Sequence, residues 1–228
     1  MADKRKTLQF QGDGSLSLTP KIGIIGWYVI CAVSAVWLTF HGEGRDGVPV
    51  NFTRQVVLLI CVITYVARAA ITLFVFVKRR VPWWEAVWGG SLIGLVLFFF
   101  LREGLRVPHR LDYVEAVGVF LYVAGSYLGT ASEYSRHLWK NRPENRGHLY
   151  TKGLFRYSRH VNYFGDLLLF TGLAILTGQV WAGFVPLAMG VNFVFVLIPA
   201  HDAYLAMRYG AEFTEYAQTT KKLVPLLY

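Results

Sequence analysis

The sequence predicts an all-α fold, a polytopic membrane bundle of about six transmembrane helices. Hydrophobic side chains make up 54% of the 228 residues and charged side chains only 16%. The mean hydropathy is +0.40, and several long runs carry no charge or a single one. Such runs predict membrane spans, because a helix needs about 20 apolar residues to cross about 30 Å of hydrocarbon.

The apolar runs follow one another along the chain. The first four cover residues 22–40, 55–77, 84–101 and 113–131, and a pair within residues 167–200 is interrupted near residues 178–179. We expect residues 1–21 to form a cytoplasmic N-terminal arm and residues 22–228 to form a single membrane-embedded domain. The first span is not a predicted signal peptide, because it is too long and no small-residue cleavage pattern follows it closely.

Lysines and arginines predict the orientation of the chain. With the N-terminus in the cytoplasm, seventeen of them fall on that side and five on the other, as the positive-inside rule requires. Both termini of this multi-pass protein are therefore expected to be cytoplasmic. We interpret the net charge of +9 as a result of this bias and as a sign of anionic partners, either lipid headgroups or a ligand. Nucleic acid is not an expected partner, because no soluble basic domain presents the charge.

The sequence lacks the motifs of several common nucleotide-binding and metal-binding sites. No G-x-G-x-x-G follows a predicted strand, and the chain has neither G-x-x-x-x-G-K-[ST] nor H-E-x-x-H. Cys31 and Cys61 lie in apolar runs, where they are expected to fill space, and no cluster has the spacing of metal ligands. We expect no metal, and a bound nucleotide must be held by helices and loops.

Polar residues occur in and at the edge of the predicted spans. Arg68 lies ten residues before Lys78, which is about 15 Å along a helix, and an arginine at that depth indicates a functional site by default. Tyr65 lies three residues earlier on the same face, and Glu85 opens the third span. The alternative for Arg68 is an internal ion pair with Glu85 or Asp166. The alternative for Glu85 is a first-turn carboxylate favoured by the helix dipole.

Residues 133–162 connect two predicted spans, and this connection is too long to be a loop without a function. If the fourth helix continues to Lys140, Glu133 and Lys140 share one of its faces, and helical spacing after the loop puts Asn162 and Asp166 on one face. The connection also carries guanidinium groups suited to phosphate, at Arg142, Arg146 and Arg159. A solvated basic loop is the alternative, but polar residues continue into the bilayer edge, so we interpret the connection as one wall of a cofactor pocket.

A second polar set begins where the last span ends. His201 and Asp202 lie at that end, and Tyr204 and Arg208 follow on the same side of the helix as His201. We expect this set to meet the connection at the cytoplasmic interface and to line the same cavity. The tail, residues 201–228, is amphipathic and is expected to return to the membrane surface.

These residues resemble those of the membrane superfamily that holds the steroid 5α-reductases, the sterol C=C reductases and a bacterial branch of reductase-like proteins. The segment "NRPENRGHLYTKGLFRYSRHVNYFGDLLLFTG" is similar to the family's Asn-Arg-Gly, Gly-Leu-aromatic and Ser-Arg-His-Pro-Asn-Tyr-Phe-Gly-acid pattern, with Val161 in place of the proline. Tyr65-x-x-Arg68 resembles the segment whose tyrosine faces the substrate carbonyl and whose arginine contacts NADPH. The resemblance covers about residues 58–228.

The resemblance implies a membrane-bound NADPH-dependent reductase of a conjugated C=C bond in a lipophilic steroid-, isoprenoid- or fatty-acyl-like substrate, and hence a part in lipid metabolism. It implies that Tyr65 is the general acid or electrophile. Glu85 or Glu43 then orients it in place of the family's Gln-Glu pair, and Glu85 is preferred. The residues implied to line the NADPH site are Arg68, Glu133, Arg146, Tyr150, Arg159, His160, Asn162, Tyr163, Asp166, His201 and Tyr204.

Two alternatives remain open. The isoprenylcysteine and phospholipid methyltransferases form a sister group that shares an Arg-His-Pro-x-Tyr-x-Gly segment, and they imply S-adenosylmethionine as the cofactor and a lipid or thiol as the methyl acceptor. Their Glu-Glu pair in the tail is replaced here by His201–Asp202, which disfavours this alternative. The second alternative is a non-catalytic membrane binding subunit that keeps the pocket.

Overall fold

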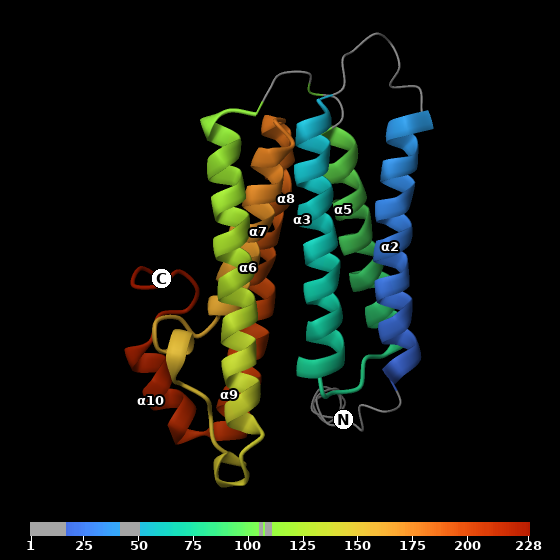
Figure 1. Ribbon diagram of the computed structural model, residues 1–228. Helices are drawn as coiled ribbons and strands as arrows, with labels where there is room; N and C mark the ends of the chain where they lie inside the picture. Colours follow the sequence, from blue (N-terminus) through green and yellow to red (C-terminus); the bar gives the residue numbers. More distant parts are fainter. Residues whose placement is uncertain (1–16, 42–50, 105–106, 108–110) are drawn as a thin grey trace. The chain divides into compact units, whose positions relative to one another are not determined.

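The computed structural model describes residues 17–41, 51–104, 107 and 111–228 (Figure 1). Within these ranges the chain is helical, and the one strand-like feature is an isolated parallel bridge between Ser158 and Lys221. The predicted all-α helix bundle of a multi-pass membrane protein is therefore confirmed. Five segments are long and apolar enough to cross a membrane: Leu18–Leu38, Phe52–Phe76, Trp83–Gly104, Tyr113–Lys140 and Val180–Tyr209.

The helices run in order along the chain. They are α2 (Leu18–His41), α3 (Phe52–Ile71), α4 (Trp83–Glu85), α5 (Ser91–Gly104), α6 (Tyr113–Lys140), α7 (Val161–Leu176), α8 (Phe184–Asn192), α9 (Ile198–Tyr209) and α10 (Ala211–Thr219). Three π-helical turns make longer helices of these pieces: η2 (Thr72–Phe76) extends α3, η3 (Ala86–Gly90) joins α4 to α5, and η7 (Phe193–Leu197) joins α8 to α9. Short 3-10 turns lie at η4 (Pro143–Asn145), η5 (Gly153–Arg156) and η6 (Val180–Gly183).

The structure differs from the predicted boundaries in two places. Helix α2 begins at Leu18, so the last residues of the predicted arm are helical, while residues 1–16, like Glu43, lie outside the described part of the chain. Helix α7, the first of the predicted pair, has 16 residues, which makes it about 24 Å long and shorter than the other spans. The predicted interruption after it is confirmed: Gly178 has a φ of +69°, a conformation that favours glycine.

The described chain divides into two compact units, and each is considered by itself. The first contains residues 1–119 and 173–183 as far as they are described, and the second contains residues 120–172 and 184–228. In the first unit Leu58, Val62 and Leu97 are completely buried. A Cβ atom at Gly104 would lie 2.1 Å from the end of the Leu58 side chain, so Leu58 keeps its present position because α5 has a glycine there.

A buried ion pair lies at one end of the first unit. Arg54, in the first turn of α3, is completely buried; its guanidinium lies 2.7 Å from the carboxylate of Glu115 on α6 and donates to the carbonyl of Leu176 at 3.0 Å. Arg54 is one of the five basic residues that the charge bias predicts on the non-cytoplasmic side. The structure places it inside the protein, because the first turn of α3 faces the beginning of α6 and the end of α7.

In the second unit, α6 and α7 touch through their backbones. A Cβ atom on Gly125 would lie 2.3 Å from the carbonyl oxygen of Gly165, and one on Gly165 would lie 2.8 Å from the backbone nitrogen of Gly129. Glycine therefore permits an approach that any other residue would block. Two turns beyond Gly125 lies Glu133, and just before Gly165 lies Asn162, so this contact sets the distance between their side chains.

Candidate functional site

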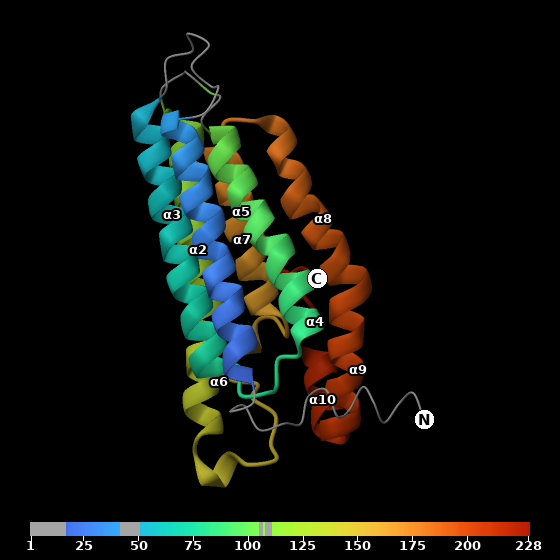
Figure 2. The same cartoon turned by 90° about the vertical axis from the view of Figure 1, so that its right-hand side faces the viewer.

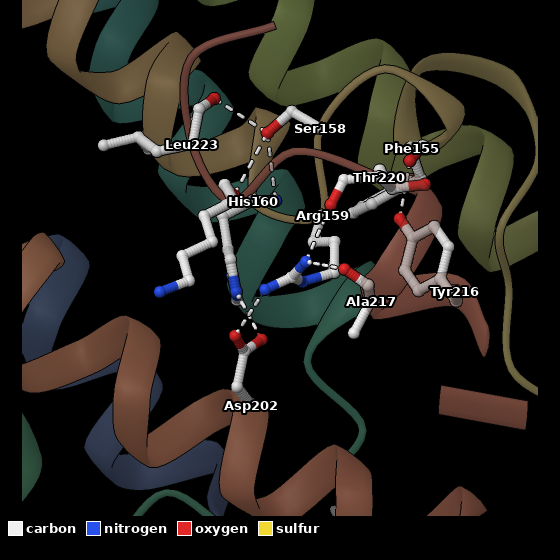
Figure 3. A network of polar contacts seen from close by, with 10 residues as sticks. Phe155, Ser158, Arg159, His160, Asp202, Tyr216, Ala217, Thr220 and Leu223 are labelled. Atoms are coloured by element: carbon white, nitrogen blue, oxygen red, sulfur yellow. Dashed lines mark hydrogen bonds and ion pairs between the residues drawn. The ribbon is translucent and has the colours of Figure 1, made fainter. Parts of the chain in front are cut away.

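Asp202 on α9 holds the Arg159–His160 segment in place (Figure 3). One carboxylate oxygen of Asp202 lies 2.9 Å from the guanidinium of Arg159, and the other lies 2.9 Å from Nε2 of His160. Arg159 and His160 expose only 7% and 1% of their surface. Charge-assisted hydrogen bonds are stronger than neutral ones, so Asp202 fixes the orientation of both buried side chains.

The C-terminal tail holds the same segment from another direction (Figure 3). Two backbone hydrogen bonds join the segments: the N–H of Arg159 donates to the carbonyl of Lys221 at 2.8 Å, and the N–H of His160 donates to that of Lys222 at 3.1 Å. The hydroxyl of Ser158 also lies within hydrogen-bond distance of the carbonyls of Leu223, at 2.7 Å, and Lys222, at 3.2 Å. The tail therefore acts as a short partner strand that orders the backbone next to Asp202.

Arg159 also caps the C-terminal end of α10. Its second terminal nitrogen donates to the carbonyls of Ala217 at 2.9 Å and Thr220 at 2.7 Å, carbonyls that a helix end leaves without internal partners. The hydroxyl of Tyr216 donates to the carbonyl of Phe155 at 2.5 Å. Burial raises the pKa of this hydroxyl above its ordinary value, so it stays a donor. The guanidinium of Arg159 is thus directed at protein groups.

Aromatic rings are stacked beside this network. The ring of His160 lies parallel to that of Tyr163, with centroids 5.3 Å apart, and Tyr163 in turn lies 4.8 Å from Phe193. The ring of His201 is 5.4 Å from His160 and 6.4 Å from Tyr204. Nδ1 of His201 is buried and has no hydrogen-bond partner among the described residues. A buried polar atom without a partner is costly, which makes this nitrogen a candidate contact for a ligand.

Glu133 and Asn162 meet across the α6–α7 contact. The amide of Asn162 donates to Glu133 at 3.1 Å, and the same carboxyl group forms an ion pair with Arg136 one turn further along α6. The side chain of Glu133 is 14% exposed and that of Arg136 is 42% exposed. The pair thus offers one sheltered carboxylate and one accessible guanidinium.

Two further predicted residues of the second unit, Tyr150 and Arg146, have different surroundings. Tyr150 is buried in an apolar cluster, where its ring lies 5.4 Å from Trp139 and 5.7 Å from Phe155. Arg146 is exposed directly after η4. Asp166 is half-buried on α7, one turn after Asn162. The cluster therefore consists of Glu133, Arg159, His160, Asn162, Tyr163, His201 and Tyr204 from the prediction, together with Asp202 and Arg136.

Tyr65, Arg68 and Glu85 belong to the first unit. The carboxylate of Glu85 forms an ion pair with Arg79, with one contact at 2.7 Å. The ring of Tyr65 lies 6.2 Å from that of Tyr28. Arg68 is half-buried in the last turn of α3. A part for Tyr65, Glu85 or Arg68 in the site stays a prediction.

The polar set predicted at the end of the last span includes Asp202, but the residues implied to line the NADPH site do not; in the structure Asp202 bonds to both Arg159 and His160. A signal for it is present in the sequence. Asp202 is the single acidic residue between Asp166 and Glu212, and it stands directly at the end of an apolar run. A lone carboxylate at such a place needs cationic partners, and Arg159–His160 is the Arg-His pair that the sequence analysis singled out.

Several proteins with similar sequences are methyltransferases by name. The "Probable O-methyltransferase ustE" of Ustilaginoidea virens is 33% identical over 95 residues, which are 41% of this chain and 33% of that protein. A "Probable protein-S-isoprenylcysteine O-methyltransferase" of Oryza sativa subsp. indica is 28% identical over 141 residues, 56% of this chain and 70% of that protein. The "Protein-S-isoprenylcysteine O-methyltransferase B" of Arabidopsis thaliana is 26% identical over 120 residues, 50% and 61% of the two chains. The chain thus spans a third of the first relative's length.

These relatives correct the expected enzyme class. The prediction of an NADPH-dependent oxidoreductase is wrong, because the relatives are named as transferases and none of them supports NADPH. The error has a physical origin. The Arg-His segment that carried the resemblance is common to both groups of proteins, and Arg159, the guanidinium expected to face a cofactor, is bonded to Asp202 and to carbonyls of the tail. The roles of Tyr65 and Glu85 in a reductase were implied only by that resemblance, and without an NADPH-dependent reaction nothing supports them.

The family comparison covers the same cluster. The matching region begins at residue 86, directly after Glu85, and ends at residue 220. It contains Glu133, the Arg159–His160 segment and Asp202. Through this region, which is more than half of its length, the chain belongs to the family described as "Protein of unknown function (DUF1295)".

Proposed function

We propose that this chain is a membrane-embedded methyltransferase that uses S-adenosylmethionine and methylates an oxygen or sulfur atom of a lipophilic acceptor. The observation that carries the proposal is the bonding of Asp202 to both Arg159 and His160. In the methyltransferases that the sequence resembles, the Arg-His segment is accompanied by a Glu-Glu pair in the tail. This chain has His201–Asp202 there, so the second acid of the pair is kept as a carboxylate, and it is the one that fixes the Arg-His segment.

The chemistry of the cluster fits this cofactor. S-adenosylmethionine carries a sulfonium cation, an amino acid end with both charges, and an adenine ring. The stacked rings of His160 and Tyr163, with the tilted ring of His201 beside them, suit a flat base or a cation. The unpaired nitrogen of His201 suits a polar group, and Glu133 with Arg136 suits the ammonium and carboxylate. Bound there, the cofactor supplies an electrophilic methyl group on a positively charged sulfur.

The protein's own residues then have two tasks. Asp202 and the tail keep Arg159 and His160 in one orientation, which provides a rigid wall for the cofactor. The buried position of this wall keeps water away from the methyl group, and alignment with exclusion of water is the main help that a methyl transfer needs from a protein. The acceptor reaches the site from the lipid, since the chain is a multi-pass membrane protein.

Calorimetry on the detergent-solubilised chain tests the cofactor. We expect S-adenosylmethionine to bind and NADPH not to bind; binding of NADPH alone would contradict the proposal. Glu133→Gln should weaken cofactor affinity by about 10-fold or more, because a charged hydrogen bond is lost, and should leave the Tm unchanged. Asp202→Asn should lower both affinity and Tm, because Arg159 stays buried without its charged partner. Glu215→Gln, on the exposed side of α10, is the control and should change neither.

A transfer assay tests the reaction itself. The chain is incubated with S-adenosylmethionine that carries a tritiated methyl group and with N-acetyl-S-farnesylcysteine, a probe acceptor with an isoprenoid chain, a thioether and a carboxylate. A second arm uses an extract of membrane lipids. We expect tritium in the organic-soluble product of at least one arm. Cofactor binding without transfer in either arm would instead indicate a binding subunit.

A further inference from the structure

The last residues of the chain form a tight turn that presents leucines to the outside. The N–H of Leu223 donates to the carbonyl of Tyr228 at 2.6 Å, and Leu226 has a φ of +67°, which is unfavourable for a leucine. Leu226 and Leu227 are 76% and 77% exposed, while Leu223 is only 3% exposed. Leu223 therefore anchors the turn in the protein, and the backbone accepts a strained conformation that leaves two large apolar side chains uncovered.

Basic and aromatic side chains surround these leucines. Lys221 and Lys222 are exposed, and the ammonium of Lys222 lies 5.6 Å from the ring of Tyr228. The bridge between Ser158 and Lys221 brings Arg156 and Tyr157 to the same place, where the guanidinium of Arg156 lies 5.0 Å from the Tyr157 ring. Neither segment contains an acidic residue. We call this set the tail patch: Arg156, Tyr157, Lys221, Lys222, Leu226, Leu227 and Tyr228.

The C-terminal end of the tail patch lies level with the middle of a helix that is long enough to cross a membrane. Figures 1 and 2 place the C-terminal end near the middle of α6 along its length, whereas α10 lies nearer the end of α6. Helix α6 is one of the segments long and apolar enough to cross a membrane. Within the second unit, the chain therefore turns back after α10, from the end of α6 toward the part of α6 that lipid would surround.

We propose that the tail patch is inserted into the lipid leaflet at this end of the second unit, and that it selects anionic lipids. Leu226 and Leu227 lie among the acyl chains, and Tyr157 and Tyr228 lie at the headgroup level, where aromatic rings are favoured. Lys221, Lys222 and Arg156 reach the phosphates while their stems stay in apolar surroundings. Each basic residue near an anionic surface strengthens the insertion by about fivefold.

A spin label on the full-length chain tests the insertion. Cys31 and Cys61 are first replaced by alanine, and the label is attached to Leu227→Cys or, as a reference, to Glu215→Cys on the exposed side of α10. The chain is placed in nanodiscs of mixed phosphatidylcholine and phosphatidylglycerol. Collisions of the label with oxygen, which concentrates in lipid, and with a nickel chelate, which stays in water, are then measured. We expect the label at Leu227 to collide with oxygen and the label at Glu215 to collide with nickel.

The selection of anionic lipid has its own comparison. Lys222→Gln, or nanodiscs of phosphatidylcholine alone, should increase nickel collisions at Leu227, and the single substitution should reduce the ratio of inserted to free tail by about fivefold. Arg142→Gln removes the same charge from the loop after α6 and should have no effect. Equal nickel access at Leu227 and Glu215 would overturn the insertion, as would protection of Leu227 from both reagents, which indicates cover by protein. Equal behaviour in both lipids would overturn the selectivity, and a label at Leu226 repeats the test should Leu227→Cys fail to fold.

Discussion

At the scale of single residues, the completely buried Arg54 depends on Glu115 and on the carbonyl of Leu176. We expect Arg54→Ala to lower the free energy of unfolding by about 3–5 kcal/mol, because the substitution leaves the Glu115 carboxylate buried without its partner. The measurement is unfolding of the detergent-solubilised chain with a denaturing detergent, followed by circular dichroism.

Two comparisons separate this effect from general damage. The double substitution Arg54→Met with Glu115→Leu should be less destabilising than Arg54→Ala, because no unpaired charge remains. Arg79→Ala breaks a pair with Glu85 in which both side chains are about a third exposed, and should cost less than about 1 kcal/mol. A double variant as unstable as the single one would contradict the assignment.

The contrast between Arg54 and Arg68 shows what could be predicted for single residues. Arg68 drew attention because it lies deep in a span, counted along one helix, whereas Arg54 stood at the edge of the same span. In the structure Arg54 is completely buried and Arg68 is half-buried. The sequence shows how far along a predicted span an arginine lies. Burial depends on neighbours, and the partners of Arg54 lie 61 and 122 residues away.

At the scale of elements, the packing of α6 on α7 depends on glycine. A Cβ atom on Gly125 would lie 2.3 Å from the carbonyl of Gly165 and 2.5 Å from the nitrogen of Leu169. We expect Gly125→Ala to cost about 1–3 kcal/mol of stability and to weaken cofactor affinity, because α6 must move away and take Glu133 with it. Thermal unfolding and calorimetry measure the two effects.

Gly190→Ala is the matched control for this element. Gly190 is also helical and in the second unit, but a Cβ atom there would lie 3.7 Å from Leu167, an ordinary contact. Alanine is the better helix former by about 1 kcal/mol, so Gly190→Ala should leave the Tm unchanged or raise it. A similar fall in Tm for both variants would mean that the close contact is not what Gly125 provides.

Elements were predictable where a local pattern defines them. The apolar runs gave the second, third and fourth spans to within a few residues at their starts, and α6 does continue to Lys140, which was the condition for Glu133 and Lys140 to share a face. The pairing of residues 158–160 with residues 221–223 was not predictable, because its two halves are more than sixty residues apart and contain no strand pattern. Asp202 was placed in the predicted polar set, but its bonds to Arg159 and His160 were not predictable for the same reason, because these partners lie 43 and 42 residues away.

At the scale of the whole molecule, composition determined the class of the protein but not its chemistry. Apolar content and the charge bias were enough for a multi-pass helical membrane protein, since the bilayer imposes those features on any such chain. The enzyme class was predicted wrongly, because its evidence was one Arg-His segment common to two groups of proteins. The segment alone does not separate the two groups; the similarity to proteins named as methyltransferases and the bonding of Asp202 to both Arg159 and His160 support the transferase.

Orientation is a prediction for the whole chain, and α7 is the helix on which it depends. Lysines and arginines place residues 133–162 in the cytoplasm, so the turn after α7 should be on the opposite side, although α7 has only 16 residues. In a chain with Cys31 and Cys61 replaced by alanine, Val180→Cys, at a residue 98% exposed, should react with a membrane-impermeant maleimide in intact cells. Lys152→Cys should react only after permeabilisation. The opposite pattern would reverse the orientation, and labelling of both from one side would mean that α7 does not cross the membrane.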